Sequence, residues 1–130
     1  MPHAHSLKWT REQDPATQAV IFHLRGAMTD SPESYALVEA VRAELAAGAR
    51  AIVLDCTAVE LATSVGVGAI AASFSSAQNA GGALCLTALP ERLLTLMKIV
   101  RLHLVIPIYP SVNAALRARG PAEWSPRPKV

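Results

Sequence analysis

Hydrophobic and polar residues in the first part of the chain follow a strand pattern and then a helical one. Residues 17–25 are rich in β-branched and aromatic side chains, which predicts a strand, and residues 6–11 predict a shorter strand before it. Ser31 and Pro32 then form an N-cap followed by proline at the first helical position. Apolar residues recur at spacings of three and four until Gly48, which predicts an amphipathic helix. Its predicted inner face consists of Tyr35, Val38, Val41 and Leu45.

The rest of the chain continues to alternate between strands and helices. Residues 51–55 (AIVLD) and 83–87 (ALCLT) are continuous apolar runs of the length that buried strands have. Between them, a helical pattern begins at Thr63 or Ser64, either of which can cap it, and ends at Gly81. The remaining predicted elements are a helix that begins at Pro90, an edge strand over residues 105–108 and a last helix from Ser111 to Ala118.

This order of elements predicts an α/β fold with right-handed crossovers. We expect a single domain with a mostly parallel central sheet of about five strands and four helices, which fits the length of 130 residues. The domain is expected to span residues 1–120. Residues 121–130 show no hydrophobic periodicity and are expected to form a flexible C-terminal tail.

Composition and charge narrow the classes of protein. Hydrophobic residues make up 52% and charged residues 17%, which is typical of a globular chain and not of a disordered one. The net charge is +2, and the excess of cations lies near the C-terminus without a dense basic patch, so we expect no nucleic-acid binding. Cys56 and Cys85 fall at or near the ends of apolar runs and are expected to be a reduced, buried pair.

One stretch, residues 61–90, contains no charged side chain and is long enough to cross a bilayer. Serine, threonine, asparagine, glutamine and glycine residues interrupt it, whereas a spanning helix needs about 20 predominantly apolar residues. We therefore expect no membrane insertion. The first residues lack the basic start and apolar core of a secretory leader, so the expected localisation is cytoplasmic.

Residues 66–71, GVGAIA, fit the glycine pattern of a dinucleotide-binding turn. In such a turn the first glycine follows directly on a strand, whereas ten residues separate Asp55 from Gly66. The acidic residue that would hold the ribose about 20 residues later is also missing. The glycines are therefore predicted to let a helix pack closely on the sheet. A small nucleotide-binding protein stays as an alternative.

Residues with catalytic or metal-binding chemistry form no pattern in the sequence. His23 lies inside a predicted strand and His103 in an apolar stretch, and neither has a sequence neighbour at metal-ligand spacing. No nucleophile, base and orienting group can be identified together. We therefore expect a protein that is not an enzyme and has no catalytic residue, no metal and no cofactor.

Residues 51–72, AIVLDCTAVELATSVGVGAIAA, carry a resemblance to a known family. They resemble the strand, connecting turn, D-S-S-G-[LIV]-G motif and helix of the STAS domain family, the fold of bacterial anti-sigma factor antagonists. Residues 88–116, ALPERLLTLMKIVRLHLVIPIYPSVNAAL, are similar to the family's later helix, short strand and final helix. The resemblance covers residues 20–116.

The resemblance implies a regulatory binding module. Members of the family bind an ATP-using serine kinase that doubles as an anti-sigma factor, and the second serine of their motif is phosphorylated. By this motif Thr63 stands at the Asp, Ser64 at the first Ser, Val65 at the phosphorylated Ser and Gly66 at the Gly. Valine has no hydroxyl, so either the chain stays in one state or phosphorylation moves to Ser64 or Thr63. We favour the first, because a capping hydroxyl is bonded to the backbone.

Two surfaces are candidates for binding a partner. Asp55, at the expected end of a parallel strand, is predicted to lie on the same rim as residues 63–66, where open α/β sheets place functional surfaces. The apolar residues of the helix after Pro90 cannot all face inward, so a patch that includes Leu94 and Met97 is predicted to bind a partner or to form a homodimer.

The leading prediction is thus a cytoplasmic regulator that binds an anti-sigma factor or serine kinase through the rim. A soluble STAS subunit of a lipid-transport ATPase is the alternative within the class of binding proteins. The nucleotide-binding protein is the alternative outside that class.

Overall fold

The computed structural model describes residues 6–118 and Trp124. Its centre is a five-stranded sheet in the order β1-β2-β3-β4-β5, in which β1 and β2 are antiparallel and the other neighbouring strands are parallel. The strands are β1 (Lys8–Gln13), β2 (Val20–Met28), β3 (Ala51–Ala62), β4 (Ala83–Thr87) and β5 (Ile108–Tyr109). The helices are α1 (Pro32–Ala46), α2 (Ser64–Asn79), α3 (Glu91–Ile99), the 3-10 helix η1 (Leu102–Leu104) and α4 (Val112–Arg117). The predicted α/β fold is confirmed.

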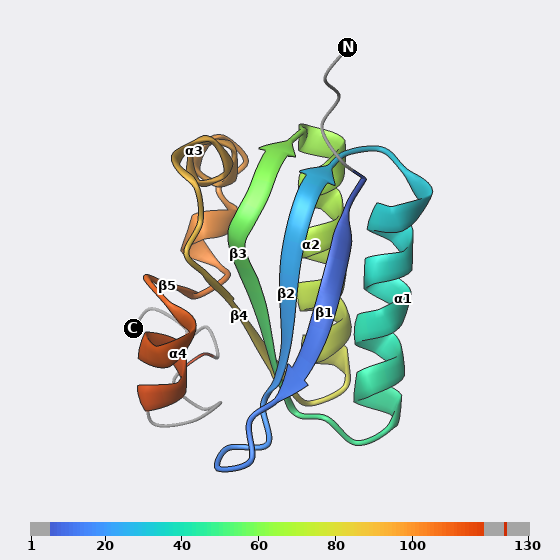
Figure 1. Ribbon diagram of the computed structural model, residues 1–130, viewed down its shortest axis with the longest axis vertical. Helices are drawn as coiled ribbons and strands as arrows, with labels where there is room; N and C mark the ends of the chain where they lie inside the picture. Colours follow the sequence, from blue (N-terminus) through green and yellow to red (C-terminus); the bar gives the residue numbers. More distant parts are fainter. Residues whose placement is uncertain (1–5, 119–123, 125–130) are drawn as a thin grey trace.

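Two apolar clusters cover opposite faces of the sheet, because successive side chains of a strand point to opposite sides. Phe22 and Leu24 of β2 belong to the larger cluster, together with buried residues of α1, α2 and α3. Ile21 of β2 belongs to the smaller cluster, together with Ala115 of α4 and Trp124. Figure 1 shows α1 and α2 side by side on one face of the sheet, and α4 next to β5 on the other side of the molecule.

Strands β2 and β3 extend farther than the sequence pattern predicts. β2 reaches Met28, three residues past the predicted end at residue 25, and β3 reaches Ala62, where the pattern predicts an end at Asp55. The two strands stay paired along the extension through two register shifts, each of which places one extra residue in β3. Because each strand finds a partner for its backbone groups, pairing overrides a local sequence that contains polar residues.

Trp124 differs from the expected tail. Its side chain is only 1% exposed, and its Nε1 donates a hydrogen bond of 3.1 Å to the carbonyl oxygen of Ala115 in α4. The indole therefore belongs to the core of the second face, and the prediction of a flexible tail is wrong for this residue. The other residues of the predicted tail, 121–123 and 125–130, lie outside the described part of the chain.

Cys56 and Cys85 are both buried and free, so they form no disulfide. They belong to the two different apolar clusters and therefore lie on opposite faces of the sheet. Burial raises the pKa of the Cys56 thiol to about 12, and it also raises the pKa of Cys85. Both side chains act as small apolar core residues, since a thiol needs to ionise to react.

Candidate functional site

The first turn of α2 lies exposed at the end of β3. Thr63 is the N-cap, and its Oγ1 accepts a hydrogen bond of 3.1 Å from the backbone amide of Gly66. Ser64 and Val65 are exposed, Val65 by 53%. The Ser64 hydroxyl has no hydrogen-bond partner within the described residues, so of the two candidate caps it is Thr63 that is used. The turn thus presents one free hydroxyl and one aliphatic side chain to a partner.

Gly66 holds this turn against the end of β2. A Cβ atom built on Gly66 would overlap the backbone carbonyl of Met28 and would lie 2.9 Å from the amide nitrogen of Thr29. The same carbonyl of Met28 accepts a hydrogen bond of 3.0 Å from the amide of Thr63. Backbone approaches this close are available only to glycine. The glycine pattern is thus explained at Gly66 by the predicted packing of the helix on the sheet.

A groove of about 550 Å³ between α1 and α2 continues from the exposed turn. Val65 and Gly68 line it from α2, and Tyr35 and Arg42 line it from α1. Tyr35 is 60% exposed, although the sequence pattern places it on the inner face of α1. Ser34 and Leu37 are buried instead, which leaves the tyrosine ring available as an aromatic contact at the groove.

Asp55 does not lie on this rim. Since β3 continues for seven residues beyond it, Asp55 is separated from the end of the strand by roughly 20 Å of extended chain. It lies instead on the face that carries the smaller cluster, where its Oδ2 bonds to His23 Nδ1 at 2.7 Å and its Oδ1 accepts hydrogen bonds from Thr57. His23 Nε2 bonds to Glu12 Oε1 at 2.8 Å. The expected place of Asp55 beside residues 63–66 is therefore wrong. The contacts from Glu12 through His23 to Asp55 connect β1, β2 and β3.

The cluster of Glu12, His23 and Asp55 shifts the pKa of two of its members. Burial lowers the pKa of His23, but its hydrogen bonds to Asp55 and Glu12 outweigh burial and raise the pKa above 6.5. Burial raises the pKa of Asp55, but hydrogen bonds from Thr57 and His23 outweigh it and bring the pKa below 3.8. Each shift favours the charged form, so the folded state is stabilised where both groups are ionised.

We predict that replacing His23 with glutamine makes stability less dependent on pH. The contribution of His23 is fully present below pH 6.5 and is lost as pH rises through its raised folded pKa. The contribution of Asp55 is present above pH 3.8 and is lost as pH falls through its lowered folded pKa. Between pH 3.8 and pH 6.5, the free energy of unfolding in urea should be about 1 kcal/mol higher for the wild type than for His23→Gln. The difference is small because solvent screens the exposed Glu12. A difference that stays constant up to about pH 9 would contradict this assignment.

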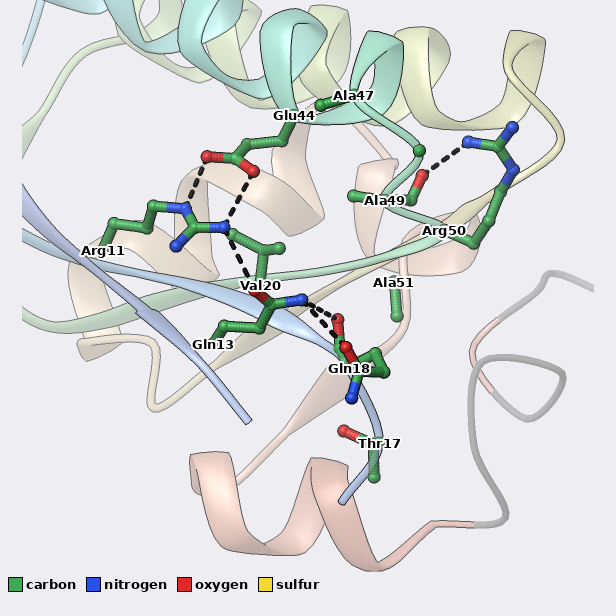
Figure 2. Close-up of a pocket in the computed structure, with 11 residues that line it drawn as sticks. Arg11, Gln13, Thr17, Gln18, Val20, Glu44, Ala47, Ala49, Arg50 and Ala51 are labelled. Atoms are coloured by element: carbon green, nitrogen blue, oxygen red, sulfur yellow. Dashed lines mark hydrogen bonds and ion pairs between the residues drawn. The ribbon is translucent and has the colours of Figure 1, made fainter. Parts of the chain in front are cut away.

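A second cavity, of about 480 Å³, lies at the opposite end of the sheet, beside the start of β3 (Figure 2). Arg11 donates from Nε and Nη2 to the carboxylate of Glu44, and Gln13 donates to the backbone and side-chain oxygens of Gln18. Arg50 Nη1 donates to the carbonyls of Leu45 and Ala49 at the end of α1. These polar side chains are hydrogen-bonded within the protein, which gives them a structural role. The lining therefore indicates no particular ligand.

The predicted patch on α3 is only partly at the surface. Leu93 and Met97, four residues apart, share the face that packs on the core, and Met97 is fully buried. Leu94 is half-buried. The inclusion of Met97 in a docking surface is therefore wrong. The exposed aliphatic residues of this region lie later, in residues 99–105, and of these the helical pattern after Pro90 includes only Val100.

Within residues 6–118 and Trp124, no three His, Cys, Asp or Glu side chains are placed to hold a metal ion. His103 Nδ1 is buried without a hydrogen-bond partner in that same part of the chain.

None of the described helices is both long enough and apolar enough to span a bilayer. The candidate site is the surface built from the first turn of α2 and the adjoining groove.

Comparisons with known proteins agree with the fold. A family model for the STAS domain matches residues 9–115. No curated protein sequence matches the chain. Among solved structures, an anti-sigma factor antagonist from Mycobacterium paratuberculosis is similar, with 26% identity and a TM-score of 0.74 over 87% of this chain and 93% of that one.

Two more distant structures share the fold. A protein from Thermotoga maritima assigned as an anti-sigma factor antagonist has 20% identity and a TM-score of 0.73, over 83% of this chain and 91% of that one. The Bacillus cell fate determinant SpoIIAA, in its phosphorylated form, has 15% identity and a TM-score of 0.59, over 84% of this chain and 96% of that one.

Proposed function

Because this chain belongs to the STAS domain family, we propose that it is a non-enzymatic regulator that binds a protein partner through the first turn of α2. The surface consists of Thr63, Ser64, Val65 and the α1–α2 groove. The proposed partner is an anti-sigma factor or serine kinase, as the resemblance implies. One observation supports this proposal above the others: residues 63–65 are all exposed at the start of α2. The close contact of Gly66 with the backbone of Met28 fixes this helix start on the sheet.

Charge explains how such a surface can be switched. A phosphate brings a charge of about −1.5 to −2 to the free amides of a helix start, where the helix itself can accommodate it. The same charge opposes binding to an acidic or apolar partner surface. The motif position of the phosphorylated serine is held here by Val65, which has no hydroxyl. We infer that this chain remains in its binding-competent state.

We predict that the wild-type protein is not a phosphotransfer substrate and that Val65→Ser becomes one. Thr63 Oγ1 is engaged with Gly66, and the Ser64 hydroxyl lies one residue away from the motif's acceptor position. After incubation with the partner kinase and ATP, intact mass should show no stoichiometric phosphate on the wild type and one phosphate on Val65→Ser. A stoichiometric adduct mapped to Ser64 or Thr63 of the wild type would refute the constitutive state.

We also predict that Ser64→Asp weakens capture of the partner by about tenfold or more, because it places an uncompensated carboxylate inside the interface. Stability should be unchanged or slightly increased, since an acidic residue in the first turn favours the helix. Ser75→Asp is the matched control, because Ser75 is exposed on the same helix about 16 Å farther along it.

The capture experiment uses the full chain as bait in extracts of the native cell. Equal loss for Ser64→Asp and Ser75→Asp, or loss for neither, contradicts docking at the first turn. The identity of the captured protein separates the two binding functions, since an anti-sigma factor supports the proposal and a transport ATPase replaces it.

A further inference from the structure

Four exposed aliphatic side chains lie together where α3 ends and η1 follows. The described residues include seven large hydrophobic side chains that are exposed, and four of these fall within residues 99–105. Ile99 is 70% exposed and Leu104 is 67% exposed. We name this set the α3–η1 patch; it consists of Ile99, Val100, Leu104 and Val105. Single exposed aliphatic residues are common on protein surfaces, but a concentration of this kind indicates an interaction surface.

The exposure of the patch follows from how the segment is attached to the core. Leu93 and Met97 hold α3, and the buried Ile106 holds the chain after η1. Hydrogen bonds from the amides of Val105 and Ile106 to the carbonyl of Leu102 close the turn between them. The patch is therefore an ordered turn, and Figure 1 shows α3 at the outer edge of the molecule, on the opposite side of the view from α1.

Cations without carboxylate partners flank the patch. Lys98 and Arg101 are exposed, and neither forms an ion pair with any described residue. Residues 92–117 contain four cations and no acidic residue. The nearest preceding acid, Glu91, lies at the other end of α3, about 12 Å along the helix from Ile99. The segment that carries the patch is therefore positive, which favours an anionic occupant.

A second copy of the chain fits this surface poorly. A two-fold interface places the same patch on both sides, which would gather the cations Lys98 and Arg101 of both copies in one interface without a carboxylate from the patch itself. The neighbouring cavity beside α3 is lined by other residues and takes in none of the four aliphatic side chains.

We propose that the α3–η1 patch docks on the surface of an anionic lipid bilayer. Its aliphatic side chains enter the boundary between headgroups and acyl chains, and Lys98 and Arg101 remain at the level of the lipid phosphates. Such an interaction requires exposed apolar surface and positive charge but no shaped pocket. It is peripheral, so it needs no helix that crosses the bilayer.

Co-sedimentation of the full chain with vesicles tests this proposal. The vesicles are phosphatidylcholine alone or phosphatidylcholine with about one third phosphatidylglycerol, at salt concentrations from about 0.05 to 0.5 M. We expect binding to the anionic vesicles only, with a loss at high salt. Ile99→Asp/Leu104→Asp and Lys98→Glu/Arg101→Glu should each reduce the bound fraction by about tenfold or more.

Lys8→Glu/Arg25→Glu is the matched control for charge, because it changes the net charge equally at two exposed, paired positions of β1 and β2. It should bind anionic vesicles substantially better than Lys98→Glu/Arg101→Glu, and all variants should keep the thermal stability of the wild type. Absence of binding, equal binding to neutral vesicles, or equal loss in the control overturns the proposal. A dimer that Ile99→Asp/Leu104→Asp converts to monomer, without vesicle binding, assigns the patch to a second copy.

Discussion

Replacing Gly66 with alanine should destabilise the domain by about 3 kcal/mol, the upper range for inserting one carbon atom into a packed site. The new Cβ would overlap the backbone carbonyl of Met28, which also accepts the amide hydrogen of Thr63. Backbone cannot rotate away as a flexible side chain can, so the start of α2 must separate from the end of β2. The change in the free energy of unfolding is measured by urea unfolding, with the same m-value for both proteins.

Gly68→Ala is the matched control, because Gly68 lies two residues farther along the same helix and a Cβ atom added there would meet nothing within 4 Å. Alanine is favoured over glycine in a helix by up to about 1 kcal/mol, so this variant should be neutral or more stable. Similar losses for the two variants would show that the contact with Met28 is not the cause. Because the exposed turn depends on this contact, Gly66→Ala should also weaken partner capture.

Replacing Trp124 with alanine should destabilise the domain by about 3 to 5 kcal/mol, as for other large aromatic residues in a core. The indole is buried against the face of the sheet that α4 also covers, and its Nε1 bonds to the carbonyl of Ala115. Without it, apolar residues of that face would be exposed and one buried carbonyl would lose its donor. Thermal unfolding of the full chain measures the effect.

Trp124→Phe separates the two contributions. Phenylalanine keeps most of the apolar area but has no donor for Ala115, so the expected loss is about 1 to 2 kcal/mol. A change below about 0.5 kcal/mol for Trp124→Ala would mean that the residue contributes little to the core, as expected of a tail.

Local sequence patterns are sufficient to predict those helices and strands whose tertiary contacts favour the same structure as the local sequence. Residues 83–87 are predicted as a strand and form β4 with the same bounds. All five side chains are buried, and a strand that is buried on both faces has a continuous apolar sequence. The start of α1 at Pro32 is predictable for a similar reason, since proline at the first helical position acts within one turn, although the Ser31 side chain makes no capping hydrogen bond. The sequence narrows the cap of α2 to two adjacent hydroxyls, and the structure selects Thr63.

Features that depend on distant contacts are not predictable in this way. The sequence pattern ends β3 at Asp55, because the pairing with β2 that extends the strand to Ala62 joins residues more than 30 positions apart. That error places Asp55 on the rim, although it pairs with His23 and Thr57. The pattern also assigns Met97 to the surface and Tyr35 to the core, because a helix of mixed composition offers several apolar stripes and only packing selects one.

The amino-acid sequence alone thus determined the order of strands and helices, the family resemblance and the replacement of the motif serine by Val65, since each of these depends on residues near one another in the chain. Only the tertiary structure decided that Gly66 lies against Met28, that His23 lies between two carboxylates and that residues 99–105 form an exposed basic and aliphatic turn. The physical reason is that exposure and close approach depend on which segments the fold brings together, and hydrophobic periodicity within one segment contains no information about its neighbours.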